Sequence, residues 1–179
     1  MIRVEPARRL DALPSLALHR AVLEEGRWFV TAAEEFDTTL ELREWQIERL
    51  NQADNSAFLV ARRPEVRVAG WLTLNGGALA RTRHVARLEV MVDPAHRRAG
   101  VGRALVEAAQ ARAARGGVLR KVSLAVLADN APAIALYRAL GFTVEGHRVG
   151  EYLEPGGEVR DDLLMAWTVP SGAPSAEER

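Results

Sequence analysis

Residues 88–102 read LEVMVDPAHRRAGVG and hold the most informative local pattern of the chain. The apolar stretch Val85–Val92 predicts a strand, and the turn after it contains Gly100 and Gly102. A strongly helical stretch, from Val101 to Arg115, follows directly. Glycines allow a close backbone approach, and the first turn of a helix presents unpaired N–H groups and a partial positive charge. This strand–turn–helix unit is therefore suited to bind an anion such as a diphosphate.

Three arginines accompany these glycines, and guanidinium groups suit phosphate recognition by forked hydrogen bonds. They are Arg97, Arg98 and Arg103. Two other phosphate loops fit the stretch poorly. A Walker A loop would need Lys and then Ser or Thr after its last glycine, where this chain has Arg103-Ala104. A dinucleotide fingerprint would need Gly or Ala where Leu105 stands.

The remaining patterns predict one α/β domain over residues 1–169. Further strands are expected at Val4–Ala7, Ala57–Arg62, Val66–Leu74, Lys121–Leu127, Thr143–Tyr152 and Leu163–Val169, and further helices at Asp11–Glu25, from Thr38 or Thr39 to about Asn51, and at Ala131–Leu140. The residues expected on the buried face of the first helix are Leu13, Leu16, Ala17, Ala21 and either Val22 or Leu23. Residues 170–179 are rich in Pro, Ser, Ala, Gly and Glu, which predicts a disordered tail.

Composition and charge narrow the class of protein. The chain has 179 residues with 24 basic and 24 acidic side chains, which argues against a strong sequence-independent nucleic-acid binder. Cysteine is absent, so a thiolate nucleophile and a Cys-based zinc site are excluded. The four histidines lack metal-ligand spacing, so no metal is expected. No stretch has the pattern of a signal peptide or a membrane span, which predicts a cytoplasmic protein without a membrane partner.

A second pattern lies downstream, and together the two resemble a known family. Residues 130–142 read NAPAIALYRALGF, with an Asn before a helix, a Tyr within it and Gly-Phe at its end. This run resembles the second cofactor segment of the GCN5-related N-acetyltransferase (GNAT) family, and residues 97–102 resemble the Arg/Gln-x-x-Gly-x-Gly/Ala acetyl-CoA loop of that family. The last hairpin, around residues 157–166, is similar to members that acylate amino acids or other small amines. The resemblance implies the GNAT fold, of class α/β, with a mixed, mostly antiparallel, splayed central sheet and flanking helices.

The resemblance also implies a binding site for acetyl-CoA as co-substrate. The pantetheine arm would lie between two splayed strands, against the backbone of Val90, Met91 and Val92. The residues of the diphosphate-binding turn would be Arg97, Arg98, Ala99, Gly100, Val101, Gly102 and Arg103. Asn130 would hydrogen-bond the arm, and it also suits a helix N-cap. Tyr137 would stand near the sulfur, where a phenol can donate to the leaving thiolate or stabilise it.

The general base is marked less clearly than the cofactor site. Some family members carry a Glu where this chain has Ala125, so that base is absent. A water molecule with Glu89 is the preferred candidate, although a strand period of two leaves open whether Glu89 faces the cleft or pairs with an arginine. The further candidates are His84, Glu34 and Glu35.

Aromatic residues in and before the second helix allow two interpretations. Trp28, Phe29, Phe36 and Trp45 all fit local core packing. The first three also fit the lining of a substrate pocket. Asp161 is expected to fix the last hairpin and not to take part in the chemistry.

Together these patterns predict an enzyme, an acyltransferase that moves an acetyl group from acetyl-CoA to a primary amine by direct attack, without a covalent enzyme intermediate. The expected acceptor is a free amino acid or a related small-molecule amine. Three alternatives remain open: a non-catalytic acyl-CoA-binding sensor, a protein N-terminal acetyltransferase, and a nucleotide- or dinucleotide-binding module. The exposed final strands could supply a homodimer interface, although nothing in the sequence requires one.

Overall fold

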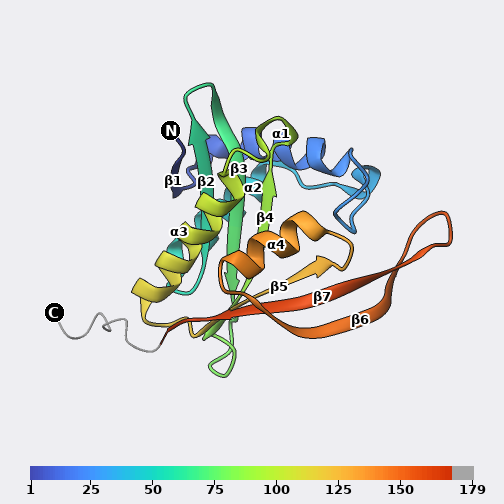
Figure 1. The fold of residues 1–179 in the computed structure, drawn as a ribbon. Helices are drawn as coiled ribbons and strands as arrows, with labels where there is room; N and C mark the ends of the chain where they lie inside the picture. The colour runs from blue at the N-terminus through green and yellow to red at the C-terminus, as the bar shows by residue number, and fades with distance from the viewer. Residues whose placement is uncertain (171–179) are drawn as a thin grey trace.

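The computed structural model describes residues 1–170, so the predicted tail lies outside the described residues except for Pro170. In the described part, seven strands form one sheet in the order β1-β2-β3-β4-β5-β7-β6, with four α-helices around it (Figure 1). The strands are β1 (Arg3–Pro6), β2 (Ala57–Arg63), β3 (Val66–Gly76), β4 (Val85–Val92), β5 (Lys121–Leu127), β6 (Thr143–Leu153) and β7 (Val159–Thr168). The helices are α1 (Ala12–Leu23), α2 (Leu40–Gln52), α3 (Val101–Gly116) and α4 (Ala131–Ala139).

Among the described strands, β4 and β5 form the single parallel pair of neighbours. They run parallel because α3 connects them and carries the chain back along the sheet, as a crossover must. The other neighbours are antiparallel. The predicted α/β class, with a mixed, mostly antiparallel sheet and flanking helices, is therefore confirmed. No helix in the described part of the chain is long and apolar enough to cross a membrane.

The two faces of the sheet carry separate apolar clusters, because consecutive strand residues point to opposite faces. Leu105 of α3 packs in the first cluster with Leu88 of β4. The buried residues of α1 and α2 pack on the other face, with Trp71 of β3 and Met91 of β4. Figure 1 shows α3 and α4 on the near side of the sheet and α1 and α2 behind it. The face that carries Trp71 and Met91 is called the α1/α2 face below.

Two strands extend by two or more residues beyond their predicted bounds. β3 continues through Gly76, because Gly76 pairs with Ala86 of β4. β7 begins at Val159, before its predicted start, because Val159 pairs with Leu153 across the last hairpin. Apolar patterns miss such extensions, since backbone pairing at the end of a hairpin needs no apolar side chain.

The predicted buried face of α1 was right only at its C-terminal end, where Val22 and Leu23 are buried; Leu13, Ala17 and Ala21 are exposed. The helix buries Ala12, Ser15, Leu18 and Val22, whereas Leu13 is 64% exposed. Leu and Ala occur all around this helix, so apolar spacing could not identify the side that contacts the sheet. Packing against β3 and β4 selected that side.

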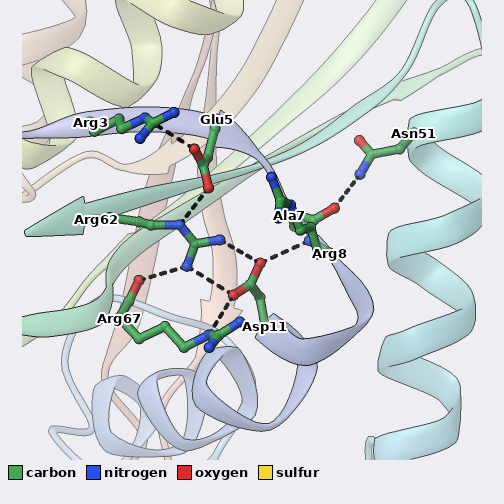
Figure 2. A network of polar contacts seen from close by, with 8 residues as sticks. All are labelled: Arg3, Glu5, Ala7, Arg8, Asp11, Asn51, Arg62 and Arg67. Atoms are coloured by element: carbon green, nitrogen blue, oxygen red, sulfur yellow. Dashed lines mark hydrogen bonds and ion pairs between the residues drawn. The ribbon is translucent and has the colours of Figure 1, made fainter.

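A buried carboxylate ties the N-terminal segment to β2 and β3 (Figure 2). Asp11 is fully buried and accepts two hydrogen bonds from the Arg62 guanidinium, at 2.8 and 2.9 Å. It also accepts Arg67 Nε at 3.0 Å and the Arg8 backbone N–H at 2.8 Å. Burial opposes ionisation, but these donors outweigh it and hold the pKa of Asp11 below its ordinary value. Sequence spacing gives no sign of this network, because its members come from separate segments.

We expect Asp11→Ala to lower the free energy of unfolding by about 3–5 kcal/mol, because it leaves the guanidinium groups without their buried partner. Urea unfolding at neutral pH, followed by circular dichroism, measures the difference. Glu65→Ala is the matched control, because it removes a half-exposed carboxylate that pairs with Arg63, and it should cost less than about 1 kcal/mol. Equal stability of the two variants would contradict the prediction. Because the folded pKa of Asp11 is lowered, its contribution is complete above about pH 4 and is lost as the pH falls through the folded pKa.

Candidate active site

The parallel pair of strands stays together for only part of its length. Pairing joins Val85–Arg87 to Lys121–Ser123 and then stops, although both strands continue. β4 remains paired with β3 up to Val92, and β5 remains paired with β7 up to Leu127. The facing edges of β4 and β5 therefore diverge, and their backbone N–H and C=O groups can bind a ligand there. The predicted splay of the central strands is confirmed.

The turn between β4 and α3 is shaped to bind an anion. Arg98 and Gly100 both have left-handed backbone conformations, with φ of 60° and 84°. Gly100 is the N-cap of α3, and the Ala104 N–H donates to the Gly100 C=O at 3.0 Å. The N–H groups of residues 101–103 precede this bond and lie at the positive end of the helix. Left-handed residues next to a helix start produce the concave set of amides that holds phosphate groups.

The three arginines of this turn have different surroundings. Arg97 donates to the Glu25 carboxylate, with Nη1 and Oε1 3.0 Å apart. Arg103 pairs along α3 with Glu107, at 3.4 Å. Arg98 lines the cleft described below and forms no ion pair with a carboxylate of residues 1–170. Arg98 is therefore the most available phosphate ligand of the three.

α4 forms a wall of the site next to the splayed strands. Asn130 caps this helix by accepting the Ala133 N–H at 3.2 Å, so the N-cap prediction is confirmed. The NH₂ group of Asn130 remains a possible donor to a ligand. Tyr137 is 7% exposed, and its ring centroid lies 5.6 Å from that of Phe142. Burial first, and then the negative charge of Glu89, raise the pKa of Tyr137, so its hydroxyl stays protonated at neutral pH.

The splay, the turn and α4 surround one cleft of about 1130 Å³. The predicted cofactor residues that line it are Val90, Met91, Val92, Arg97, Arg98, Gly100, Val101, Gly102, Arg103, Asn130 and Tyr137. Ala99 is the member of the predicted set that does not line the cleft. The fold thus gathers three separate stretches of the chain around one cavity.

Glu89 also lines this cleft, which answers the question that the strand period left open. It lies two residues before Met91 and therefore on the α1/α2 face. Its side chain is exposed, and it lines the cleft, whose walls surround it. Burial raises the pKa of Glu89, and the positive charges of Arg43 and Arg87 limit the rise.

The other candidate bases lie outside the cleft. His84 stands just before β4, where its C=O accepts the N–H groups of the residues that enter β5. Glu35 accepts the Ala32 N–H at 2.9 Å, and neither Glu35 nor Glu34 lines the cleft. Within residues 1–170, no group of three or more His, Asp and Glu side chains is arranged to hold a metal ion.

The aromatic residues in and before α2 fall into two groups. Trp28 and Phe29 line the cleft, in agreement with the pocket interpretation. Phe29 also packs against the apolar cluster of the α1/α2 face, as does Phe36, which does not line the cleft. Trp45 is 56% exposed, with the guanidinium carbon of Arg49 5.1 Å from its ring centroid, so the prediction of core packing was wrong for this residue. A cation over the ring lets a tryptophan lie on a helix surface.

Several polar residues of the cleft were not predicted from the sequence. They include Asn75, Arg87, Tyr152 and Asp162. Asp162 is 1% exposed and accepts hydrogen bonds from Arg148 Nε at 2.8 Å and from the Tyr152 hydroxyl at 3.3 Å. Its neighbour Asp161 accepts the Gly150 N–H at 2.7 Å, which confirms that Asp161 fixes the last hairpin. Adjacent residues of a strand point to opposite faces of the sheet, so the alternation of the two aspartates was the sequence signal that they have different surroundings.

The sequence of the chain is similar to those of known proteins. The Acetyltransferase (GNAT) family model matches residues 21–142. A mycothiol acetyltransferase of Clavibacter michiganensis is 43% identical over 93 residues, which are 50% of this chain and 28% of that protein. An L-amino acid N-acetyltransferase of Escherichia coli is 33% identical over 99 residues, which are 55% of this chain and 60% of that protein. The chain belongs to the GNAT family of acetyltransferases.

A solved structure shares the whole fold. The protein yncA of Salmonella typhimurium, determined with its cofactor acetyl-CoA, superimposes with a TM-score of 0.83 at 21% identity and covers 98% of each chain. The GNAT fold implied by the sequence is therefore confirmed. The match to the two curated relatives, in contrast, spans only 28% and 60% of their length.

The geometry around Gly102 leaves room for a ligand. A Cβ atom at Gly102 would lie 3.3 Å from Leu136 Cδ2 and 3.6 Å from Val92 Cγ2. Both of these residues line the cleft, so any side chain at position 102 would project into the space between β4 and α4. The missing side chain, the positive helix end and the free edge of β4 together fit the diphosphate and the amide-containing arm of a CoA ester.

We expect Gly102→Val to weaken acetyl-CoA binding at least about tenfold, because its methyl groups would fill the space in front of the amides. Isothermal titration calorimetry measures the change. Gly116→Val is the matched control, since a Cβ there has Asp54 O at 3.7 Å as its nearest neighbour and stands at the far end of the same helix. Wild-type affinity in folded Gly102→Val would place the ligand elsewhere.

Proposed function

We propose that this protein is an acetyl-CoA-dependent N-acetyltransferase whose acceptor is the primary amine of an amino acid or a related small molecule. The main support is that one cleft is lined by Tyr137, by Glu89 and by the turn whose shape suits an anion. Membership of the GNAT family supports acetyl-CoA as the donor. The two curated relatives are named for acetyl transfer in which mycothiol and L-amino acids take part, and they support a small-molecule acceptor.

The α3 end of the cleft binds the donor in this proposal. The N–H groups of Val101 and Gly102, with the guanidinium of Arg98, hold the diphosphate. The NH₂ group of Asn130 and the free backbone edge of residues 90–92 hold the pantetheine arm. A backbone N–H on that edge also stabilises the negative charge that develops on the thioester oxygen, as donors of an oxyanion hole do.

The reaction needs no covalent bond to the enzyme. The amine nitrogen forms a bond to the thioester carbon, the C–S bond then breaks, and the second proton of the nitrogen passes to the departing thiolate, which leaves as the free CoA thiol. Tyr137, protonated at neutral pH, faces the departing sulfur as a hydrogen-bond donor. Because the pKa of Tyr137 is raised above about 10 and a thiol has a pKa of about 8.5, stabilisation of the thiolate by hydrogen bonding outweighs full proton transfer.

Glu89 takes the proton that the amine loses, either directly or through one water molecule. An alkylammonium with a pKa of about 10 has no free lone pair, so this proton must leave before the attack. Burial raises the pKa of Glu89 above its ordinary value, which makes the carboxylate a better proton acceptor.

The remaining lining of the cleft suits a small zwitterion. Trp28 and Phe29 offer apolar contact, and Arg87 can pair with a carboxylate. Glu89 stands on the same strand as Arg87 and can hold the amine. A cation and an anion two residues apart match the two charges of an α-amino acid.

Ligand binding and turnover test this function separately. Acetyl-CoA should raise the melting temperature, whereas NAD and ATP at the same concentration should not. Release of free thiol should then appear with at least one member of a panel of amino acids and small amines, and it should be absent with the N-acetylated form of that compound. Acetyl-CoA binding without thiol release would indicate a sensor, and release with peptides alone would indicate an N-terminal acetyltransferase. Either result would refute the proposal.

Tyr137→Phe should lower kcat about 100-fold and leave acetyl-CoA affinity close to wild type, because only the hydroxyl donor to the leaving sulfur is lost. Steady-state kinetics and calorimetry measure the two quantities. The ring keeps its packing against Phe142, so an unchanged melting temperature is the control for the fold. A kcat near the wild-type value would remove Tyr137 from the mechanism.

A further inference from the structure

Arg43 is a buried cation on α2 that forms no ion pair within residues 1–170. The residue is 2% exposed. In the described structure its Nη2 lies 2.8 Å from His19 Nδ1, while its Nε is buried without a hydrogen-bond partner. A guanidinium removed from water is costly unless another charge or dipole compensates it. The buried positive charge of Arg43 therefore needs a group that compensates it.

His19 cannot be the countercharge. Arginine can only donate, so His19 Nδ1 accepts, and the imidazole is neutral with its proton on Nε2. Burial first, and then the charge of Arg43, lower the pKa of His19 to about 4, so it stays neutral at physiological pH. Partial compensation comes from the rings of Trp71 and Phe58, whose centroids lie 5.1 and 5.6 Å from the guanidinium carbon.

Glu89 is the carboxylate whose negative charge acts on Arg43. Trp71 and Met91 are cross-strand partners on the α1/α2 face, and Glu89 follows on the same face of β4. Arg43 lies over Trp71, so its guanidinium and the Glu89 carboxylate stand on the same side of the sheet. Burial lowers the pKa of Arg43 to about 10, and Glu89 is the charge that opposes this effect.

Other charged and titratable groups also surround Glu89. Arg87 on β4, Tyr137 on α4, Tyr152 on β6 and Asp162 on β7 line the cleft with Glu89, and His19 on α1 packs against Trp71. Further residues of the cleft lining are Arg27, His96, Arg97, Arg98 and Arg103. Arg87 lines the same cleft and also lowers the pKa of Glu89, but its effect is smaller than that of Arg43. Asp162 is already paired with Arg148. His19 and Tyr137 are neutral at pH 7. Arg43 thus remains as the buried positive charge that acts on Glu89.

We propose that Arg43 is a positioning residue of the active site, the buried countercharge that keeps Glu89 a carboxylate on the floor of the cleft. Arg43 does not line the cleft, so it acts through Glu89 and does not touch the acceptor. The catalytic consequence rests on the function proposed above, whereas the electrostatic link between the two residues does not.

Carbon-13 NMR of carboxyl groups measures this link in the free protein, and Glu89→Gln identifies the Glu89 signal. In Arg43→Met, we expect the pKa of Glu89 to rise by about one unit or more. Arg43→Lys keeps the charge and should restore most of the wild-type value. Arg20→Met is the matched control, because it removes an exposed guanidinium that lies 5.8 Å from the Phe36 ring. An unchanged Glu89 titration in folded Arg43→Met overturns the proposal.

The pH dependence of kcat/KM distinguishes a failure of this inference from a failure of the proposed function. The acid limb in Arg43→Met should move to higher pH by the amount that the NMR titration gives, and activity should recover above it. The ammonium pKa of the acceptor is common to all variants and cancels in this comparison. A shifted Glu89 signal with an unmoved acid limb would support the electrostatic link and overturn the role of Glu89 as base.

The wild-type protein supplies a measurement that does not depend on the folding of Arg43→Met. The buried Arg43 Nε–H signal in nitrogen-15 NMR should move as Glu89 titrates. In Glu89→Gln this movement should disappear. An Arg43 signal that does not respond to the ionisation of Glu89 overturns the proposal.

Discussion

The separation of β4 from β5 beyond Arg87 is the constraint on which the site depends. Each strand keeps its antiparallel partner on the other side, so the sheet stays intact while its centre opens. Backbone groups exposed by this opening would be costly in a closed core, but here they face a cleft that water or a ligand can enter. The turn before α3 lies at the end of the opening. Glu89 lies on one edge of the opening, and α4 lies beside it.

The two carboxylates of the cleft differ in their hydrogen-bond partners, and this difference bears on their roles. Asp162 is held directly by Arg148 and by the Tyr152 hydroxyl, so its lone pairs are already used. Glu89 has no such direct partner among the described residues, and its countercharge stands behind it on α2. A carboxylate that is stabilised at a distance remains ionised and keeps its oxygens free for a proton. Geometry thus favours a structural role for Asp162 and a chemical role for Glu89.

The segment that follows α1 is held from two sides of the cleft. At its start, Glu25 binds Arg97 of the anion-binding turn. Two residues later, the backbone C=O of Arg27 accepts Arg160 Nη1 of β7 at 2.9 Å. Trp28 and Phe29 come directly after this second contact and line the cleft. The turn before α3 and strand β7 are therefore connected through one short segment.

Local sequence determined those features of this protein that depend only on residues close together in the chain. The bounds of β4 and β5, the left-handed Gly100 and the cap Asn130 follow from residues within one turn or strand. Tertiary structure decided which side of α1 is buried, because that helix is apolar on several sides. It also decided that Glu25 engages Arg97 and that Arg43 lies behind Glu89. These pairs are far apart in the chain, and only the packing of helices on the splayed sheet brings their charges together.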